Sequence, residues 1–223
     1  MNPMSRIGPV AAILGAVLLF FGTYLHPMTA DPNVPLAAFT EYAGDSHWVA
    51  SHLMQLFGVL LMASALALLC RQMANGPAAE WAFLGIVGAV ASAAVAATLQ
   101  AVDGVALKAA INSWAASPAF NKSAVFQAAF AVRQIEMGLA SITALLSGLT
   151  FSIVGIALLI DRQLPRWFGI LAIAGGVPTA IAGIAIAYTG FSDLSMEINL
   201  PASSVLLIWM ITWGVFGWTH ASP

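Results

Sequence analysis

The chain has 223 residues, of which 61% are hydrophobic and 7% are charged, and its formal net charge at pH 7 is -2. A soluble domain carries about 25% charged residues, so this composition cannot cover a water-facing surface and predicts an integral membrane protein. This slightly negative net charge does not favour binding to nucleic acid. A single cysteine, Cys70, excludes both a disulfide within the chain and a thiolate metal cage.

Six apolar stretches predict six membrane-spanning helices, because one span needs about 20 mostly apolar residues. The predicted spans are residues 7–25, 48–70, 81–100, 137–160, 167–188 and 201–218. The first stretch is longer than the apolar core of a signal peptide, about 7–15 residues, and is interpreted as a span. Pro201 is expected in the first turn of the last span. The predicted fold is an all-α, polytopic transmembrane bundle of six helices in one membrane domain, residues 1–223.

The third and fourth spans are predicted to extend beyond the membrane. Residues 101–116 and 121–136 keep a helical pattern of apolar positions, and Ser117-Pro118 between them is a turn signal. We therefore expect an extramembrane helical hairpin over residues 101–136, reaching roughly 20 Å at 1.5 Å per residue. The alternative is an interfacial loop with partial helix.

Small residues predict where helices pack closely. Ala172, Gly176 and Ala180 are spaced four apart in the fifth span, as are Gly85 and Ala89 in the third. Such ridges let two backbones approach closely in lipid.

Arginine and lysine in the loops predict the orientation, because cytoplasmic loops are enriched in both. With the N-terminus inside, the cytoplasmic cations are Arg6, Arg71, Arg162 and Arg166, and the outer ones are Lys108, Lys122 and Arg133. The margin is small, but the inner group flanks the spans in short segments, where the rule is strongest. The expected location is the inner (cell) membrane, with both termini cytoplasmic.

Three pairs of polar residues, each spaced three apart, lie on separate apolar stretches at a similar predicted depth. They are His52 and Gln55, Gln100 and Asp103, and Arg133 and Glu136. The spacing puts each pair on one helix face. Charged side chains at membrane depth usually face the bundle interior and pair there, so these six residues are the predicted ligand-binding site, just below the outer interface.

Three chemistries could use this site. Imidazole and carboxylate groups are ligands for transition metals, and His26, His52 and Glu136 form the best candidate trio for zinc or copper. Haem iron could take one or two of the histidines. A proton or solute path could use the carboxylates as relays. Ordinary interfacial anchoring and one neutralised structural pair remain the plain alternative, and the sequence contains no recognisable catalytic motif.

Several short motifs resemble a widespread group of uncharacterised bacterial six-helix membrane proteins. They are Leu25-His26-Pro27, Trp48-x-x-x-His52 followed by Gly58, and Leu164-Pro165-Arg166-Trp167-x-Gly169. The resemblance implies the six-span topology and carries no activity with it. The length of residues 101–136 departs from that pattern.

The sequence therefore predicts a membrane protein whose polar outer-face pocket binds a small ligand, a metal or haem, with a redox-accessory role as one form of this. The alternatives are a transporter or permease for small solutes or lipids, and a structural subunit of a larger membrane complex. The expected partners are the lipid bilayer, a small ligand and a second copy or complex subunit, and not nucleic acid.

Overall fold

The computed structural model describes residues 6–220, and these residues form helices and connecting turns without any strand. Six helical segments are long and apolar enough to cross a membrane, which confirms the predicted bundle. They are α1 (Ile7–Tyr24), α3 (Trp48–Gln72), the continuous rod of α4 (Ala79–Gln100), η1 (Ala101–Leu107) and α5 (Lys108–Ala116), then α6 (Lys122–Asp161), α7 (Arg166–Thr189) and α8 (Asp193–His220).

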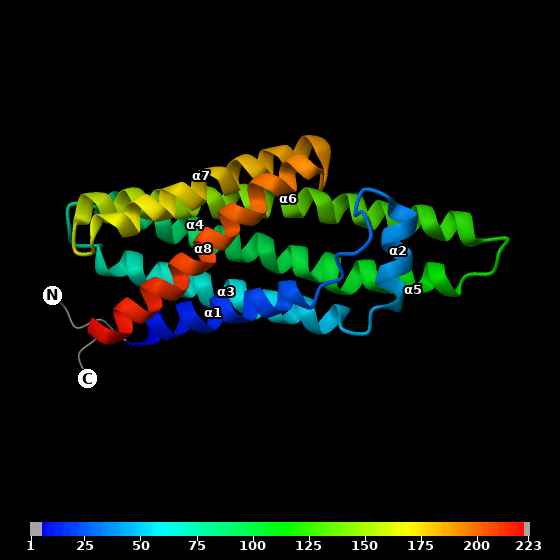
Figure 1. The fold of residues 1–223 in the computed structure, drawn as a ribbon, viewed down its shortest axis with the longest axis horizontal. Coiled ribbons are helices and arrows are strands. Elements are labelled where there is room, and N and C mark those ends of the chain that lie inside the picture. Colours follow the sequence, from blue (N-terminus) through cyan, green and yellow to red (C-terminus); the bar gives the residue numbers. More distant parts are fainter. Residues whose placement is uncertain (1–5, 221–223) are drawn as a thin grey trace.

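The six segments run up and down along one long axis (Figure 1). The start of α1 and the end of α8 lie at the same end of the bundle, here called the near end, and α5 with the start of α6 lies at the opposite, far end. Helix α8 crosses the bundle diagonally, so that it lies close to α1 at the near end and diverges from it toward the far end.

The rod containing α4 and helix α6 extend past the other spans at the far end, as predicted. Helix α6 has 40 residues and is about 60 Å long at 1.5 Å per residue, against a hydrocarbon core of about 30 Å. The hairpin turns between Ala116 and Lys122, around the predicted Ser117-Pro118. An apolar cluster holds it together, in which Trp114 packs on Phe39 and Phe126.

Two elements differ from the sequence-based prediction. Helix α2 (Pro35–Gly44) was not predicted; it is a short helix with proline in its first turn, and it lies across the far end (Figure 1). Helix α8 begins at Asp193, so Pro201 lies inside the helix and not in its first turn. Asp193 lies in the first turn of α8, where an acidic residue is favoured because the backbone dipole is positive there.

Helices α6 and α7 pack with their backbones in close contact. A Cβ atom added to Gly148 would lie 2.5 Å from the carbonyl oxygen of Gly176, and one added to Gly155 would lie 2.7 Å from that of Gly169. The predicted ridge of small residues on α7 therefore faces α6. In lipid, this close packing replaces the hydrophobic driving force as the source of helix association.

The variant Gly148→Ala is expected to lower the free energy of unfolding by about 1–3 kcal/mol, because its methyl group meets the α7 backbone, which must shift. Gly138→Ala on the same helix is the matched control, since nothing lies within 4 Å of a Cβ at Gly138. Thermal unfolding of the purified protein in detergent measures both variants. Equal melting temperatures for the two variants would contradict the close packing.

Candidate functional site

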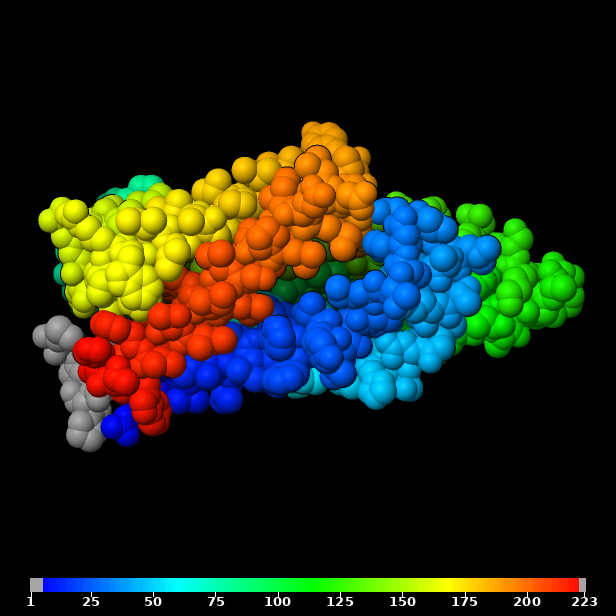
Figure 2. Space-filling model, viewed as in Figure 1, coloured from blue at the N-terminus to red at the C-terminus, as the bar shows by residue number. Residues whose placement is uncertain are grey.

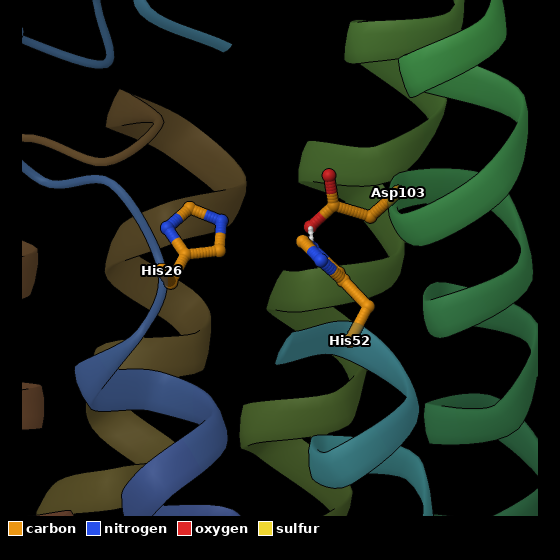
Figure 3. A group of neighbouring side chains, drawn as sticks. All are labelled: His26, His52 and Asp103. Atoms are coloured by element: carbon orange, nitrogen blue, oxygen red, sulfur yellow. Dashed lines mark ion pairs between the residues drawn. The ribbon is translucent and has the colours of Figure 1, made fainter. Parts of the chain in front are cut away.

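Three ligand-type side chains meet at the far end of the bundle, each supplied by a different segment (Figure 3). His26 follows α1, His52 lies in the first turns of α3, and Asp103 lies in η1. One ring nitrogen of each histidine and one carboxylate oxygen lie within 4.8 Å of one another. The three side chains point toward a common space between their helices.

The ring of His52 is fixed by its own helix. Its Nδ1 lies 2.6 Å from the carbonyl oxygen of Trp48, one turn earlier, and a carbonyl can only accept, so Nδ1 carries the proton. The indole of Trp48 stacks on the ring, with 4.6 Å between ring centroids. In the neutral imidazole the lone pair is then on Nε2, the nitrogen that faces Asp103.

His26 is held in the same tautomer. Its Nδ1 lies 2.8 Å from the carbonyl oxygen of Pro27, which again assigns the proton to Nδ1 and leaves Nε2 with the lone pair. Burial lowers the pKa of His26, Asp103 partly opposes this shift and His52 adds to it. Neutral imidazole is the form that ligates metal, and an Nδ1–H bonded to a backbone carbonyl is the usual outer partner of a metal-bound histidine.

The carboxylate of Asp103 comes from a π-helical segment. Its backbone carbonyl accepts a hydrogen bond of 3.0 Å from the indole Nε1 of Trp48, which ties η1 to α3. The next residue, Gly104, faces His52, and a Cβ there would lie 2.6 Å from the Cβ of His52. Glycine thus permits close approach of the two helices. Single π-helical turns occur often at functional sites.

His52 and Asp103 form an ion-pair contact that is not a directed hydrogen bond. Their Nε2 and Oδ2 atoms lie 3.0 Å apart, and the His52 and Asp103 side chains are 2% and 13% exposed. Even so, His52 Nε2 and Asp103 Oδ1 are both buried without a hydrogen-bond partner, so the carboxylate lies off the direction in which an Nε2–H would donate. Buried polar atoms without partners are rare in native proteins, and an ordered water or a bound ion is the usual explanation.

The structure places Arg133 and Glu136 beside this group but not in it. The Arg133 guanidinium contacts the Glu136 carboxylate at 2.7 Å, and both side chains are almost fully buried. Among the described residues, the carboxylate that completes the two-histidine group belongs to Asp103, not to the predicted Glu136. The physical reason is the three-residue spacing on α6, which pairs Glu136 with its own neighbour first.

The remaining predicted residues, Gln55 and Gln100, meet across α3 and α4. The Gln100 amide nitrogen donates to the Gln55 amide oxygen at 3.1 Å. Gln100 is 9% exposed and its own amide oxygen has no partner. The six predicted residues therefore gather at one level of the bundle, in three contacts: His52 with Asp103, Arg133 with Glu136, and Gln55 with Gln100.

Helix α2 covers the site, and sequence reasoning missed it. The ring of Tyr42 packs on Trp48 at 4.5 Å and lies near His26 at 6.0 Å. The Nζ of Lys108 donates to three carbonyls at the end of α2, those of Tyr42, Ala43 and Asp45. The signal available in the sequence was Pro35 followed by apolar residues ahead of Gly44, which is the pattern of a short capped helix.

Comparisons with protein-family models, with curated proteins and with solved structures give no match.

Replacing Lys108 by methionine is expected to loosen α2 and uncover the site. The three carbonyls at the end of α2 lose a charged donor, which costs on the order of 1–2 kcal/mol for a half-exposed group. Hydrogen exchange of the α2 amides should quicken while exchange in α7 is unchanged. Lys122→Met is the matched control, because the Lys122 amine donates to one carbonyl of α5, that of Ala115, and lies over the Trp114 ring, with no hydrogen bond to the end of α2. Exchange in α2 that quickens as much in this control as in Lys108→Met would contradict the assignment.

Proposed function

We propose that this membrane protein binds a divalent transition-metal ion through His26, His52 and Asp103. One observation carries the proposal: both imidazoles donate Nδ1–H to backbone carbonyls, so that both Nε2 lone pairs are available beside a carboxylate. A second supports it, because the buried Nε2 of His52 and Oδ1 of Asp103 have no hydrogen-bond partner. A bound cation satisfies these atoms and compensates the charge of Asp103.

The donor set favours zinc or a similar first-row ion. Two imidazoles and one carboxylate are borderline ligands that suit zinc and its neighbours, whereas Cu(I) prefers thiolates and thioethers. Haem is supported less, since the two rings lie 5.1 Å apart between centroids and both contact Trp48. Three protein ligands leave at least one coordination position for water or a small ligand, as in catalytic zinc sites.

The two alternative functions have less support. A path for ions needs polar groups through the whole bundle. On the near-end side of Gln100, however, the hydroxyls of Ser92 and Thr150 are hydrogen-bonded to one another. The hydroxyl of Thr179 is bonded to a carbonyl of its own helix. A subunit role has only the exposed apolar helix faces in its favour, and these faces are also what a lipid-facing bundle presents.

We further propose that the near end faces the cytoplasm of a cell membrane. The near end carries Arg71 in the last turn of α3, Arg162 between α6 and α7, and Arg166 at the start of α7. Arg6 packs over the Trp218 ring at 4.9 Å. At the far end, Arg133 is buried in an ion pair and so does not count as a loop charge. Four cations against two then favour a cytoplasmic near end.

Purified protein is expected to bind one zinc ion per chain, measured by elemental analysis and by competition with a chromophoric chelator. His26→Ala, His52→Ala and Asp103→Asn should each weaken binding at least about ten-fold, because even loss of an outer partner of a metal ligand costs about 10–100-fold. Glu136→Gln should change the affinity by no more than a few-fold, since Glu136 stands outside the group.

His47→Ala is the matched histidine control, because the His47 side chain is 70% exposed a few residues before His52. Melting temperatures of all variants check that each one is folded. Zinc affinity that is unchanged in His52→Ala and Asp103→Asn, or that falls equally in His47→Ala, would overturn the metal site.

The orientation can be tested with two single-cysteine probes, because the native Cys70 is buried. In intact cells, a membrane-impermeant maleimide should label Ala119→Cys in the turn between α5 and α6. It should label Asn75→Cys in the turn between α3 and α4 only after the cells are broken. The reverse pattern would place the near end outside.

A further inference from the structure

A cavity of about 650 Å³ lies inside the bundle, on the near-end side of the ligand group. Most of its wall is apolar, including Leu19, Met62, Phe151 and Leu206. Cavities of about 300–1,000 Å³ with mostly apolar walls and a few polar groups are typical of small-molecule sites.

The cavity opens sideways, between α1 and α8. These helices diverge toward the far end, and the space-filling view shows a hollow between them that exposes the helices behind (Figure 2). Phe20 and Tyr24 of α1 and Leu200 and Ser204 of α8 are among its lining residues. Because both helices are apolar enough to span a membrane, the opening faces lipid, and an occupant enters from the bilayer.

The far-end part of the cavity carries polar atoms that lack partners. Gln100 lines the cavity, is nine-tenths buried and bonds Gln55 through one amide atom only. The hydroxyl of Thr143, from α6, also lines the cavity and is buried without a partner. His26 borders the same part of the cavity. A buried group without its hydrogen bond is unfavourable, so these atoms favour a polar occupant here.

The charge of the walls restricts the head group of that occupant. None of the described residues that line the cavity is Asp, Glu, Lys or Arg. Arg133 is paired with Glu136, and the amine of Lys108 bonds the α2 carbonyls. Without a bound metal, a phosphate or carboxylate head would therefore meet no counter-charge in the cavity wall, at a large cost. A neutral hydroxyl avoids this cost, because it both donates and accepts and so can pair with the Gln100 amide oxygen or with the Thr143 hydroxyl.

We propose that this cavity binds a neutral amphipathic lipid with a hydroxyl head and an apolar tail. The head lies at Gln100 and Thr143, and the tail extends along the apolar wall toward the gap between α1 and α8. The site is distinct from the metal ligands His52 and Asp103, and it does not depend on a metal being bound. It borders His26, so the head group lies next to the proposed metal.

The test uses two photoreactive probes in phosphatidylcholine nanodiscs: a diazirine-bearing hexadecanol and the matching diazirine-bearing hexadecane without the hydroxyl. The alcohol should label peptides from the cavity wall about 3- to 10-fold more than the hydrocarbon does, the preference that one hydrogen bond supplies. Gln100→Leu should bring alcohol labelling of the wall down to the hydrocarbon level. Ala144→Phe, which places a bulky ring in the cavity, should abolish wall labelling by both probes.

Val90→Phe is the matched control, because Val90 is 62% exposed on the outer face of α4 and its substitution leaves the cavity unchanged. Equal wall labelling by the two probes, or wall labelling that survives Ala144→Phe, would overturn the proposal. A probe with a phosphate head that outcompetes the alcohol would also overturn it, in favour of a phospholipid. Zinc binding measured on Gln100→Leu separates the two proposals, since this variant should bind zinc like the parent protein.

Discussion

The site depends on where the Nδ1 protons of two histidines are placed. Each Nδ1–H is directed at a backbone carbonyl at the boundary of its own segment, that of Pro27 after α1 and that of Trp48 in α3. In a low-dielectric bundle such hydrogen bonds are strong, and polar atoms that remain without a hydrogen bond are unfavourable. Fixing Nδ1 leaves two Nε2 atoms and a carboxylate in one small space. The aromatic packing, the glycine contact and the cover by α2 all serve to hold that arrangement.

Asp103 lies in a π-helical turn that directly follows the buried stripe of α4. Helix α4 packs on α6 with Gly85, Ala89, Ser92 and Ala96 buried along one stripe, and the stripe continues to Gln100. In a regular α-helix the stripe of buried residues would continue past Asp103 on the same face. A wider π-helical turn changes the face on which the following residues lie. The Trp48 indole donates to the Asp103 carbonyl within that turn, and this bond joins the turn to α3.

The six spans, the far-end hairpin and the gathering of the polar pairs followed from hydropathy and three-residue spacing. Both are local features of the sequence, and the bilayer makes them reliable. An apolar stretch of about 20 residues in lipid has few stable conformations other than a spanning helix. The three-residue spacing already pairs Glu136 with Arg133, but the contact of Asp103 with His52 could not be predicted, because it depends on how η1 packs on α3. Helix α2 was missed because ten residues with mixed polarity resemble a loop until Tyr42 and Phe39 find their tertiary partners.

The metal group and the cavity share one residue, and this links the two proposals physically. His26 belongs to the ligand group and also borders the cavity, while His52 and Asp103 are enclosed by α3 and η1. An occupant whose head lies at Gln100 is therefore beside His26, the one proposed metal ligand that is not on a spanning helix.

His26 lies on the connection between α1 and α2, and its ring packs against the rings of Trp48 and Tyr42. Of the three ligands it is the one whose position a cavity occupant can alter.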